Sequence, residues 1–456
     1  MQNNNSSHIH IWFLVPVLAM VLALFTQYSG KHYEPTFVPR PVLNPSEEIK
    51  QYSFVDYDNN VLQFPGKTDG FERFFDKLDT LITYGKGKVN IMHIGGSHVQ
   101  AGMLSGRMRE NMFTLADGIK GERGFIFPYR MAHTNNPGNY KATFTGDWEG
   151  CRNALKRNHC PWGLSGITAT THDTATQTKI YCVDNNHDTY WFNKVRIYHL
   201  ATPESFLVRL DSSILVDTVY TDSVVGLTTF ELSQSYDTLL FETVKTDSSQ
   251  DYFVLQGIRL ENDDSGLTYN SIGVNGASVP AYLRCQYFQP HLETNVPDMV
   301  IFGIGINDSY VPVDQFHQDE YEQNYRDLMA MFRAVNPDVQ FLFMTNNDSY
   351  YKRRYPNQNI FKVQKAMMNL AREYNGAYWD LFEIMGGLNS IKLWERAGLA
   401  QKDKVHFTRK GYYLNADLLF VALRNSYGDH LAQKYYAHKN SDNSSPQVEQ
   451  NTPNTN

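Results

Sequence analysis

Residues 88–100 read KVNIMHIGGSHVQ, an apolar run followed by two glycines and a serine. The run predicts a buried strand at residues 88–94, and the two glycines allow a tight turn after it. Ser97 would then follow a strand and precede a helix. Ligands of open α/β sheets bind beyond the carboxyl ends of the strands, so Ser97 is a candidate for chemistry. Taken alone, a serine at this place fits a helix cap equally well.

The same alternation returns later in the chain. Helical stripes are predicted around residues 71–81 and 321–332, then at 363–374 and 411–423, and apolar strands at 299–302, 340–344 and 377–381. Strands that alternate with helices are typical of a parallel sheet covered by helices on both faces. The sequence therefore predicts an α/β fold.

The helical period is lost between residues 121 and 264. Seven or so short β-type runs replace it, and turns such as Asp-Ser-Ser at residues 211–213 and 247–249 separate several of them. This spacing predicts a β-sandwich. Because the α/β pattern resumes afterwards, the sandwich is expected as an insert at 121–264 between two parts of one α/β domain, 66–120 and 265–435.

The two ends of the chain differ from this pattern. An apolar run at residues 11–25 predicts a membrane anchor or signal segment within 1–30, and the lack of an Ala-x-Ala cleavage site favours an uncleaved anchor. A proline-bearing linker is expected at 31–65 and a disordered polar tail at 436–456. The bulk of the protein is thus expected outside the cytoplasm, in the periplasm or cell envelope.

The composition of the chain restricts the kinds of partner that the protein can bind. The chain has 456 residues and a formal net charge of -7, so nucleic acid is an unsuitable partner. Aromatic residues make up 14% of the chain, which suits stacking on sugars as well as ordinary core packing. Trp148, Trp162 and Trp191 are the candidate sugar-facing residues of the insert. Of the four cysteines, Cys151 and Cys160 are close enough in sequence to form a disulfide, although four free thiols fit equally well.

Four further residues could carry chemistry. Gly276 follows a short β run and would let a backbone N–H approach a substrate, and the Asn307 amide could donate to an oxyanion. Just before the last predicted helix, Asp403 and His406 are three residues apart. A neutral histidine can accept a serine proton, and an aspartate can fix its tautomer. Each feature has an ordinary structural explanation when taken singly.

The order Ser, Gly, Asn, Asp-x-x-His along one α/β pattern resembles the SGNH (GDSL-type) hydrolases. The resemblance implies a flavodoxin-like parallel sheet and no cofactor or metal. It makes Ser97 the nucleophile, Asp403 and His406 its catalytic partners, and the Ser97 and Gly276 N–H groups with the Asn307 amide an oxyanion hole. One departure is plain: the family has Gly-Asp-Ser where this chain has Gly95-Gly96-Ser97. Weakened catalysis is therefore expected.

A second group of motifs indicates which branch of this family the chain resembles. The chain has WDLF at 379–382, MGG at 385–387, Trp394, DKVHFT at 403–408 and GY at 411–412. This set is similar to bacterial SGNH proteins related to peptidoglycan O-acetylesterases, which also carry a carbohydrate-binding-like sandwich between the serine and glycine blocks. The resemblance implies removal of O-acetyl groups from an extracytoplasmic glycan, above all peptidoglycan. Acetyl transfer to a polysaccharide, a non-catalytic glycan-binding protein and an envelope scaffold are the alternatives.

Overall fold

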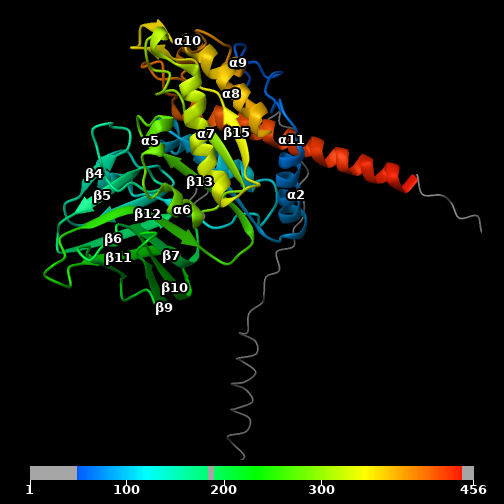
Figure 1. Ribbon diagram of the computed structural model, residues 1–456. Helices are drawn as coiled ribbons and strands as arrows, with labels where there is room; N and C mark the ends of the chain where they lie inside the picture. Colours follow the sequence, from blue (N-terminus) through cyan, green and yellow to red (C-terminus); the bar gives the residue numbers. More distant parts are fainter. Residues whose placement is uncertain (1–48, 183–188, 444–456) are drawn as a thin grey trace, which may run out of the picture.

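The computed structural model describes residues 49–182 and 189–443, and its centre is a parallel sheet of five strands (Figure 1). The strands are β1 (Lys88–Gly95), β13 (Gly266–Gly273), β14 (Met299–Gly303), β15 (Gln340–Met344) and β18 (Ala377–Trp379). Their spatial order is β13-β1-β14-β15-β18. Counted within the α/β domain, this is the 2-1-3-4-5 order of flavodoxin-like folds. The predicted fold class is confirmed.

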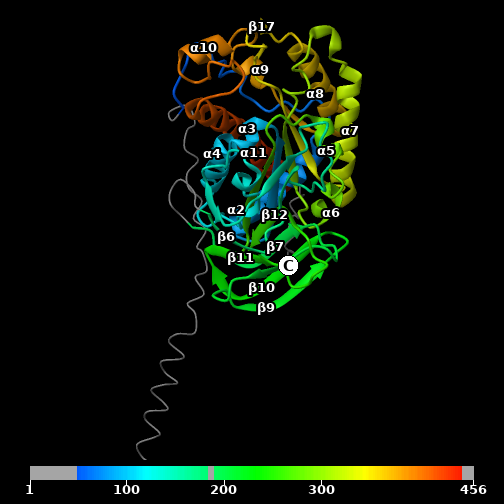
Figure 2. The same cartoon turned by 90° about the vertical axis from the view of Figure 1, so that its left-hand side faces the viewer.

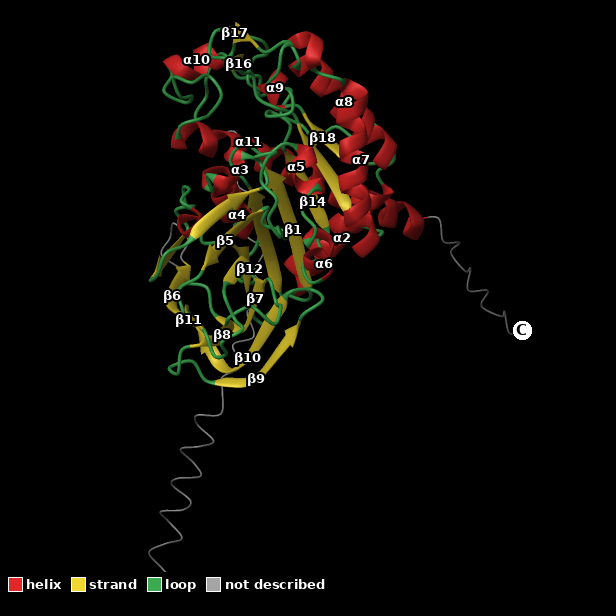
Figure 3. Ribbon diagram, turned by 60° about the vertical axis from the view of Figure 1, so that its left-hand side comes forward, coloured by secondary structure: helices red, strands yellow, loops and turns green. Residues whose placement is uncertain are grey.

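Helices cover both faces of this sheet (Figure 3). One face carries α2 (Asp69–Tyr84), α4 (Met103–Phe113) and α11 (Arg409–Asn443). The other carries α5 (Val279–Leu283), α6 (Phe288–Glu293), α7 (Gln318–Val335) and α8 (Ile360–Tyr374). Shorter helices are α3 (Ser97–Gln100), α9 (Leu381–Ile384), α10 (Ile391–Arg396) and the 3-10 turns η3 (Tyr129–Ala132) and η4 (Val313–Gln315).

The strands are apolar on both sides because both sides are covered. In β14, Met299 and Ile301 join the core beneath α2, α4 and α11, whereas Val300 and Phe302 join the core beneath the opposite helices. Successive strand side chains point to opposite faces, so a continuous apolar run supplies two cores at once.

The segment between β1 and β13 contains two antiparallel sheets packed as a sandwich (Figure 2). The larger sheet holds β2 (Gly124–Ile126), β4 (Glu149–Arg152), β5 (Ile167–Thr171), β7 (Phe192–His199), β9 (Val216–Asp222), β10 (Leu227–Tyr236) and β12 (Phe253–Glu261). The smaller sheet holds β3 (Tyr140–Phe144), β6 (Ala175–Cys182), β8 (Leu207–Leu210) and β11 (Thr238–Val244). The inserted all-β domain is thereby confirmed, and β13 returns the chain to pair with β1.

The expected linker is wrong for residues 49–65, which belong to the α/β domain. Val55 and Leu62 are buried in its core. Gln63 and Tyr378 exchange backbone hydrogen bonds of 2.9 and 2.8 Å, so the segment covers the open edge of β18. A strand edge has unpaired N–H and C=O groups, and covering it satisfies them.

Two element ends also differ from expectation. β18 stops at Trp379, two residues early, because Asp380 begins α9 and accepts a hydrogen bond from the Glu383 N–H. Helix α11 runs to Asn443, beyond the expected start of the disordered tail at 436. His430 and Lys434 of this helix both bond Asp76 of α2, at 2.8 and 2.7 Å. These contacts hold α11 against the domain as far as Lys434, and Tyr435 and Tyr436 beyond them are exposed.

The expected membrane segment at 1–30 and the tail beyond 443 lie outside the described residues. Within the described ranges, no helix has the length and hydropathy needed to cross a bilayer. A short hairpin, β16 (Tyr350–Tyr351) and β17 (Tyr355–Pro356), follows β15 and lies at one end of the α/β domain.

Candidate active site

Ser97, His406 and Asp403 form a continuous hydrogen-bonded chain. Ser97 is the first residue of α3, directly beyond β1, and its Oγ lies 2.8 Å from His406 Nε2. His406 Nδ1 lies 2.7 Å from Asp403 Oδ2. More than 300 residues separate the serine from its two partners, and the fold brings them into contact. Nucleophile, base and orienting carboxylate are in the relation that nucleophilic catalysis requires.

The Asp403–His406 turn fixes its own carboxylate. Asp403 Oδ1 accepts hydrogen bonds from the N–H groups of Val405 and His406, both 3.0 Å. Lys404 adopts a φ of 57°, which bends the chain so that these N–H groups face the carboxylate. Burial acts to raise the pKa of Asp403, but the bonds from the His406 ring and from the two N–H groups outweigh it and lower the pKa below its ordinary value. Asp403 therefore stays ionised and holds the proton of His406 on Nδ1.

A second histidine packs behind the first. The His98 ring lies 5.1 Å from the His406 ring, and its Nδ1 is 3.0 Å from the Tyr412 hydroxyl at the start of α11. Burial, together with the positive charge of His406, lowers the pKa of His98 to about 3. His98 thus stays neutral when His406 takes up a proton, so the two rings do not compete for it.

The five residues predicted from the sequence line a single cavity of about 570 Å³: Ser97, Gly276, Asn307, Asp403 and His406. Ser97 follows β1 and Asn307 follows β14, two neighbouring strands at the point where the strand order reverses. Gly276 follows β13 with a φ of 84°, a conformation that favours glycine. The Asn307 amide donates one hydrogen to the Ala277 carbonyl at 2.8 Å, which leaves its second hydrogen for another acceptor.

Gly96, where the resembled family has aspartate, lies against this same group. A Cβ at position 96 would be 3.1 Å from Asn307 Nδ2 and 3.4 Å from the Ala277 carbonyl oxygen. The glycine thus lets the Asn307 amide approach the backbone before Ser97 closely. The departure affects the oxyanion side of the site and leaves the Ser97–His406–Asp403 contacts complete.

The insert reaches the site through an amide cluster that the sequence analysis missed. Gln100 Oε1 accepts from the Asn275 N–H at 2.6 Å, and Gln100 Nε2 donates to the Asn135 carbonyl at 3.0 Å. Asn275 Nδ2 donates to Asn135 Oδ1 at 2.6 Å, and both amides contact the Thr134 hydroxyl. The loop that carries Gly276 is therefore held between α3 and the insert. The available signal was the amide residue beside each predicted block, Gln100 after Ser97 and Asn275 before Gly276.

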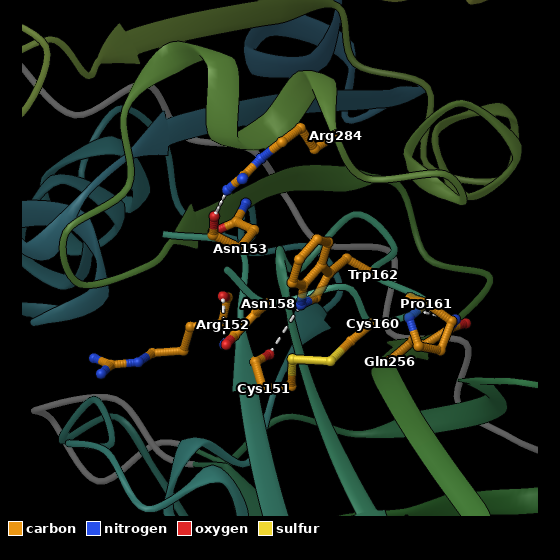
Figure 4. The surroundings of a disulfide bond; sticks show 9 residues. All are labelled: Cys151, Arg152, Asn153, Asn158, Cys160, Pro161, Trp162, Gln256 and Arg284. Atoms are coloured by element: carbon orange, nitrogen blue, oxygen red, sulfur yellow. Dashed lines mark hydrogen bonds between the residues drawn. A yellow bond between two sulfur atoms is a disulfide. The ribbon is translucent and has the colours of Figure 1, made fainter. Parts of the chain in front are cut away.

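A disulfide joins two cysteines of the insert (Figure 4). Cys151 and Cys160 are bonded, which decides between the two states that the sequence left open; Cys182 and Cys285 are free and buried. Arg284 reaches from the α/β domain to the Asn153 carbonyl, as Figure 4 shows. The next residue, Ala154, lies beside Gly276, because a Cβ on the glycine would be 3.6 Å from the alanine methyl, in ordinary van der Waals contact.

Two of the three candidate sugar-facing tryptophans are core residues. Trp148 and Trp162 are 3% and 2% exposed, and their indole N–H groups donate to the carbonyls of Thr145 and Cys151, both at 3.0 Å. They cannot stack on a sugar. Trp191 is 54% exposed but lies outside the set of residues that line the cavity.

Asp308, next to Asn307, is a partly buried residue whose carboxyl group faces the start of α5. Burial raises its pKa to about 7, against the opposing effect of hydrogen bonds from the N–H groups of Val279 and of Asp308 itself. Its oxygens lie 3.1 and 3.3 Å from the Val279 nitrogen. An unfolded chain loses this proton near pH 3.8, so folding becomes less favourable as pH rises from about 4 to 7.

Asp308→Asn is expected to remove that pH dependence. Asparagine still accepts from the Val279 N–H but carries no charge to bury. The free energy of unfolding of the variant minus that of wild type should be about 3 kcal/mol larger at pH 8 than at pH 4.5. Urea unfolding of both proteins at the two pH values measures the difference. Equal differences at both pH values would show that Asp308 is already ionised at low pH in the folded protein.

Comparisons with known proteins found one matching family model and several similar solved structures. Residues 253–414 match the model of the GDSL-like lipase/acylhydrolase family, a range that holds Gly276, Asn307, Asp403 and His406, while Ser97 precedes the insert. A structure described as "Peptidoglycan O-acetylesterase in action" is similar over 81% of this chain and 99% of its own, with 20% identity and a TM-score of 0.66.

Other similarities cover about a third of this chain. An acetyl xylan esterase aligns with 21% identity over 35% of this chain and 82% of its own, with a TM-score of 0.27. A GDSL-like lipase from Bacteroides thetaiotaomicron VPI-5482 aligns with 15% identity over 36% and 76%, with a TM-score of 0.25. Comparison of the sequence with curated proteins gives no match.

Proposed function

We propose that the chain is a serine esterase of the SGNH (GDSL-like) type, with its α/β domain interrupted by a β-sandwich, and that it removes O-acetyl groups from an extracytoplasmic glycan. The observation that carries the proposal is the unbroken contact from Ser97 Oγ to His406 Nε2, 2.8 Å, and from His406 Nδ1 to Asp403, 2.7 Å, at the wall of an open cavity. Peptidoglycan is the favoured glycan. The similarity to a structure described as a peptidoglycan O-acetylesterase, over 81% of this chain and 99% of that one, supports it through the shared architecture.

The reaction follows from the positions of these groups. Ser97 Oγ attacks the acetyl carbonyl carbon while His406 Nε2 accepts the serine proton. The negative charge that develops on the carbonyl oxygen is stabilised by the N–H groups of Ser97 and Gly276 and by the free hydrogen of the Asn307 amide. Ser97 begins α3, so its N–H has no partner within the helix.

Collapse of the tetrahedral intermediate completes the first half of the reaction. The bond between the acetyl carbon and the sugar oxygen breaks, and His406 gives its proton to that oxygen, which releases a sugar hydroxyl and an acetyl-serine. Water then attacks the acetyl carbon while His406 accepts a proton from it. The bond between that carbon and Ser97 Oγ breaks, His406 gives the proton back to Oγ, and acetate leaves. Asp403 stabilises the imidazolium in both halves because it stays ionised beside Nδ1.

Asn307→Ala is expected to lower kcat by about 10²- to 10³-fold, or roughly 2.7–4 kcal/mol of barrier, because one oxyanion donor is lost. Initial rates with an aryl acetate measure the effect. Asn193→Ala, which removes an amide bonded to Asp263 on the insert surface, is the matched control and should keep the wild-type rate. A kcat within twofold of wild type in Asn307→Ala would exclude the amide from the oxyanion hole.

The proposed location is the periplasm or cell envelope. The Cys151–Cys160 disulfide supports it, since disulfides persist in oxidising compartments. Tethering by the apolar run at residues 11–25 is part of the same proposal.

The test of substrate and reaction type is acetate release by the purified protein. O-acetylated peptidoglycan and other acetylated polysaccharides are offered in parallel, with an aryl acetate as a general probe. Acetate release from a glycan supports an esterase. A newly acetylated glycan would support a transferase, and retention on a glycan without any turnover would support a binding protein.

A further inference from the structure

The rim of the cavity carries one cation whose charge the proposed reaction does not use. Arg353 lines the cavity together with Ser97 and His406, and its side chain is exposed. Its guanidinium has no hydrogen-bond or ion-pair partner within residues 49–182 and 189–443. Among the lining residues the one carboxylate is Asp403, which His406 already engages. A substrate in the cavity therefore meets one unpaired positive charge.

Arg353 is held at the rim by the hairpin β16–β17. The Tyr350 N–H donates to the Lys404 carbonyl at 3.0 Å, within the turn that joins Asp403 to His406. The Lys352 N–H donates to the Tyr310 hydroxyl at 2.8 Å, and Tyr310 also lines the cavity. Tyr310 and Tyr351 pack edge to face at 5.1 Å. The hairpin is thus fixed to the catalytic turn and to the segment that follows Asn307.

The tip of this hairpin has an unfavourable backbone. Lys352 and Arg353 have φ angles of 50° and 59°, a left-handed conformation that side chains with a Cβ seldom adopt. A tight hairpin turn requires a positive φ at both of its central residues, and the Arg354 N–H closes this turn on the Tyr351 carbonyl at 3.1 Å. Here the enforced geometry places a guanidinium at the mouth of the cavity.

Other cations lie close to the same hairpin. Lys392 and Lys404 lie over the Tyr350 ring at 4.9 and 5.0 Å, and Lys352 lies over the Tyr351 ring at 5.1 Å. The chain as a whole has a net charge of -7, so this group is a local positive region on an acidic protein. Such a region raises the local concentration of anionic substrates.

We infer that Arg353 binds a carboxylate of the glycan, so that the preferred substrate is an acetylated acidic sugar whose carboxylate lies near the acetylated hydroxyl. This inference rests on the proposed esterase function and narrows its substrate class. A planar guanidinium fork matches a carboxylate with two parallel hydrogen bonds. One unpaired cation in the cavity suits a single negative charge better than a phosphate monoester, which carries nearly two.

The test compares three probes on the full-length protein: mono-O-acetylated methyl glycosides of glucuronic acid, of its uronamide and of glucose. At pH 7 and low salt, kcat/KM is expected to be at least about tenfold higher for the uronic acid than for the uronamide or glucose probe. Arg353→Gln should bring that ratio close to one, and Arg353→Lys should keep part of it. Added sodium chloride at 0.5 M should reduce the ratio in wild type.

Arg354→Gln is the matched control, since it removes the same charge from the neighbouring residue, which does not line the cavity. It should keep the wild-type ratio. A wild-type ratio near one, an unchanged ratio in Arg353→Gln, or an equal loss in Arg354→Gln would overturn the inference.

Binding separates this inference from the proposed function. In the Ser97→Ala background the uronic acid probe stays intact, and calorimetry gives its Kd. Tighter binding of the acid than of the uronamide, weakened about tenfold by Arg353→Gln, would support the carboxylate site even if the protein released no acetate. Turnover of all three probes at equal rates, with equal Kd values, would support the proposed esterase function and exclude the carboxylate site.

Discussion

Ser97→Ala is expected to lower acetate release by roughly 10⁴- to 10⁶-fold, because the variant cannot form an acetyl-enzyme. The serine hydroxyl is the group in contact with His406 Nε2 at the cavity wall, and the methyl of alanine neither attacks a carbonyl nor gives up a proton. The residual rate would come from water held near the oxyanion donors. Single-turnover measurements with an aryl acetate, followed by mass spectrometry of the protein, report both the rate and the acetyl adduct.

The outcome has a direct control. Ser249→Ala removes a hydroxyl from an exposed turn of the insert, where it bonds Asp247 at 2.6 Å, and should keep wild-type turnover and the adduct. Turnover by Ser97→Ala within tenfold of wild type, or an adduct on another residue, would show that the nucleophile lies elsewhere.

Asp403→Asn is expected to lower kcat by about 10⁴-fold while leaving the fold unchanged. The asparagine oxygen can still accept from the N–H groups of Val405 and His406, so the turn should persist. Its NH₂ group would face His406 Nδ1 and donate to it. The ring proton would then move to Nε2, which could no longer accept the proton of Ser97.

A wrong tautomer can be told from a damaged structure. Asp338→Asn changes the same chemistry at an exposed ion pair with Arg73 and should leave kcat at the wild-type value. Thermal unfolding of Asp403→Asn should stay close to wild type. A small loss of kcat, less than tenfold, would mean that the carboxylate neither fixes the tautomer nor stabilises the imidazolium.

The local sequence was sufficient for the α/β framework. Strand β14 is a continuous apolar run because both of its faces are buried, and β1 and β15 are mostly apolar for the same reason. The loss of helical period after residue 121 marked the sandwich, and the turns between its strands are local features. Periodicity reports burial on each face of an element, which is why fold class and the insert could be predicted.

The candidate triad was also visible in the sequence, since its members follow predicted strands or precede a predicted helix. Their meeting was an inference from the ordered motifs, and the 2.8 Å contact between Ser97 and His406 is a property of the tertiary structure. The ends of the helices and strands were harder to predict from the sequence. The segment 49–65 packs on the edge of β18 because its partner Tyr378 lies far away in the chain, and α11 continues past residue 435.

The sequence by itself determined which residues can react: a serine beyond a strand, a glycine and an asparagine at later strand ends, and an aspartate and histidine one turn apart. Only the tertiary structure decided what surrounds them. Asn135 of the insert holds the Asn275 loop across 140 residues, and the β16–β17 hairpin brings Arg353 to the rim of the same cavity. Such contacts depend on how two domains and several loops pack together, and no local repeat of apolar and polar residues encodes that packing.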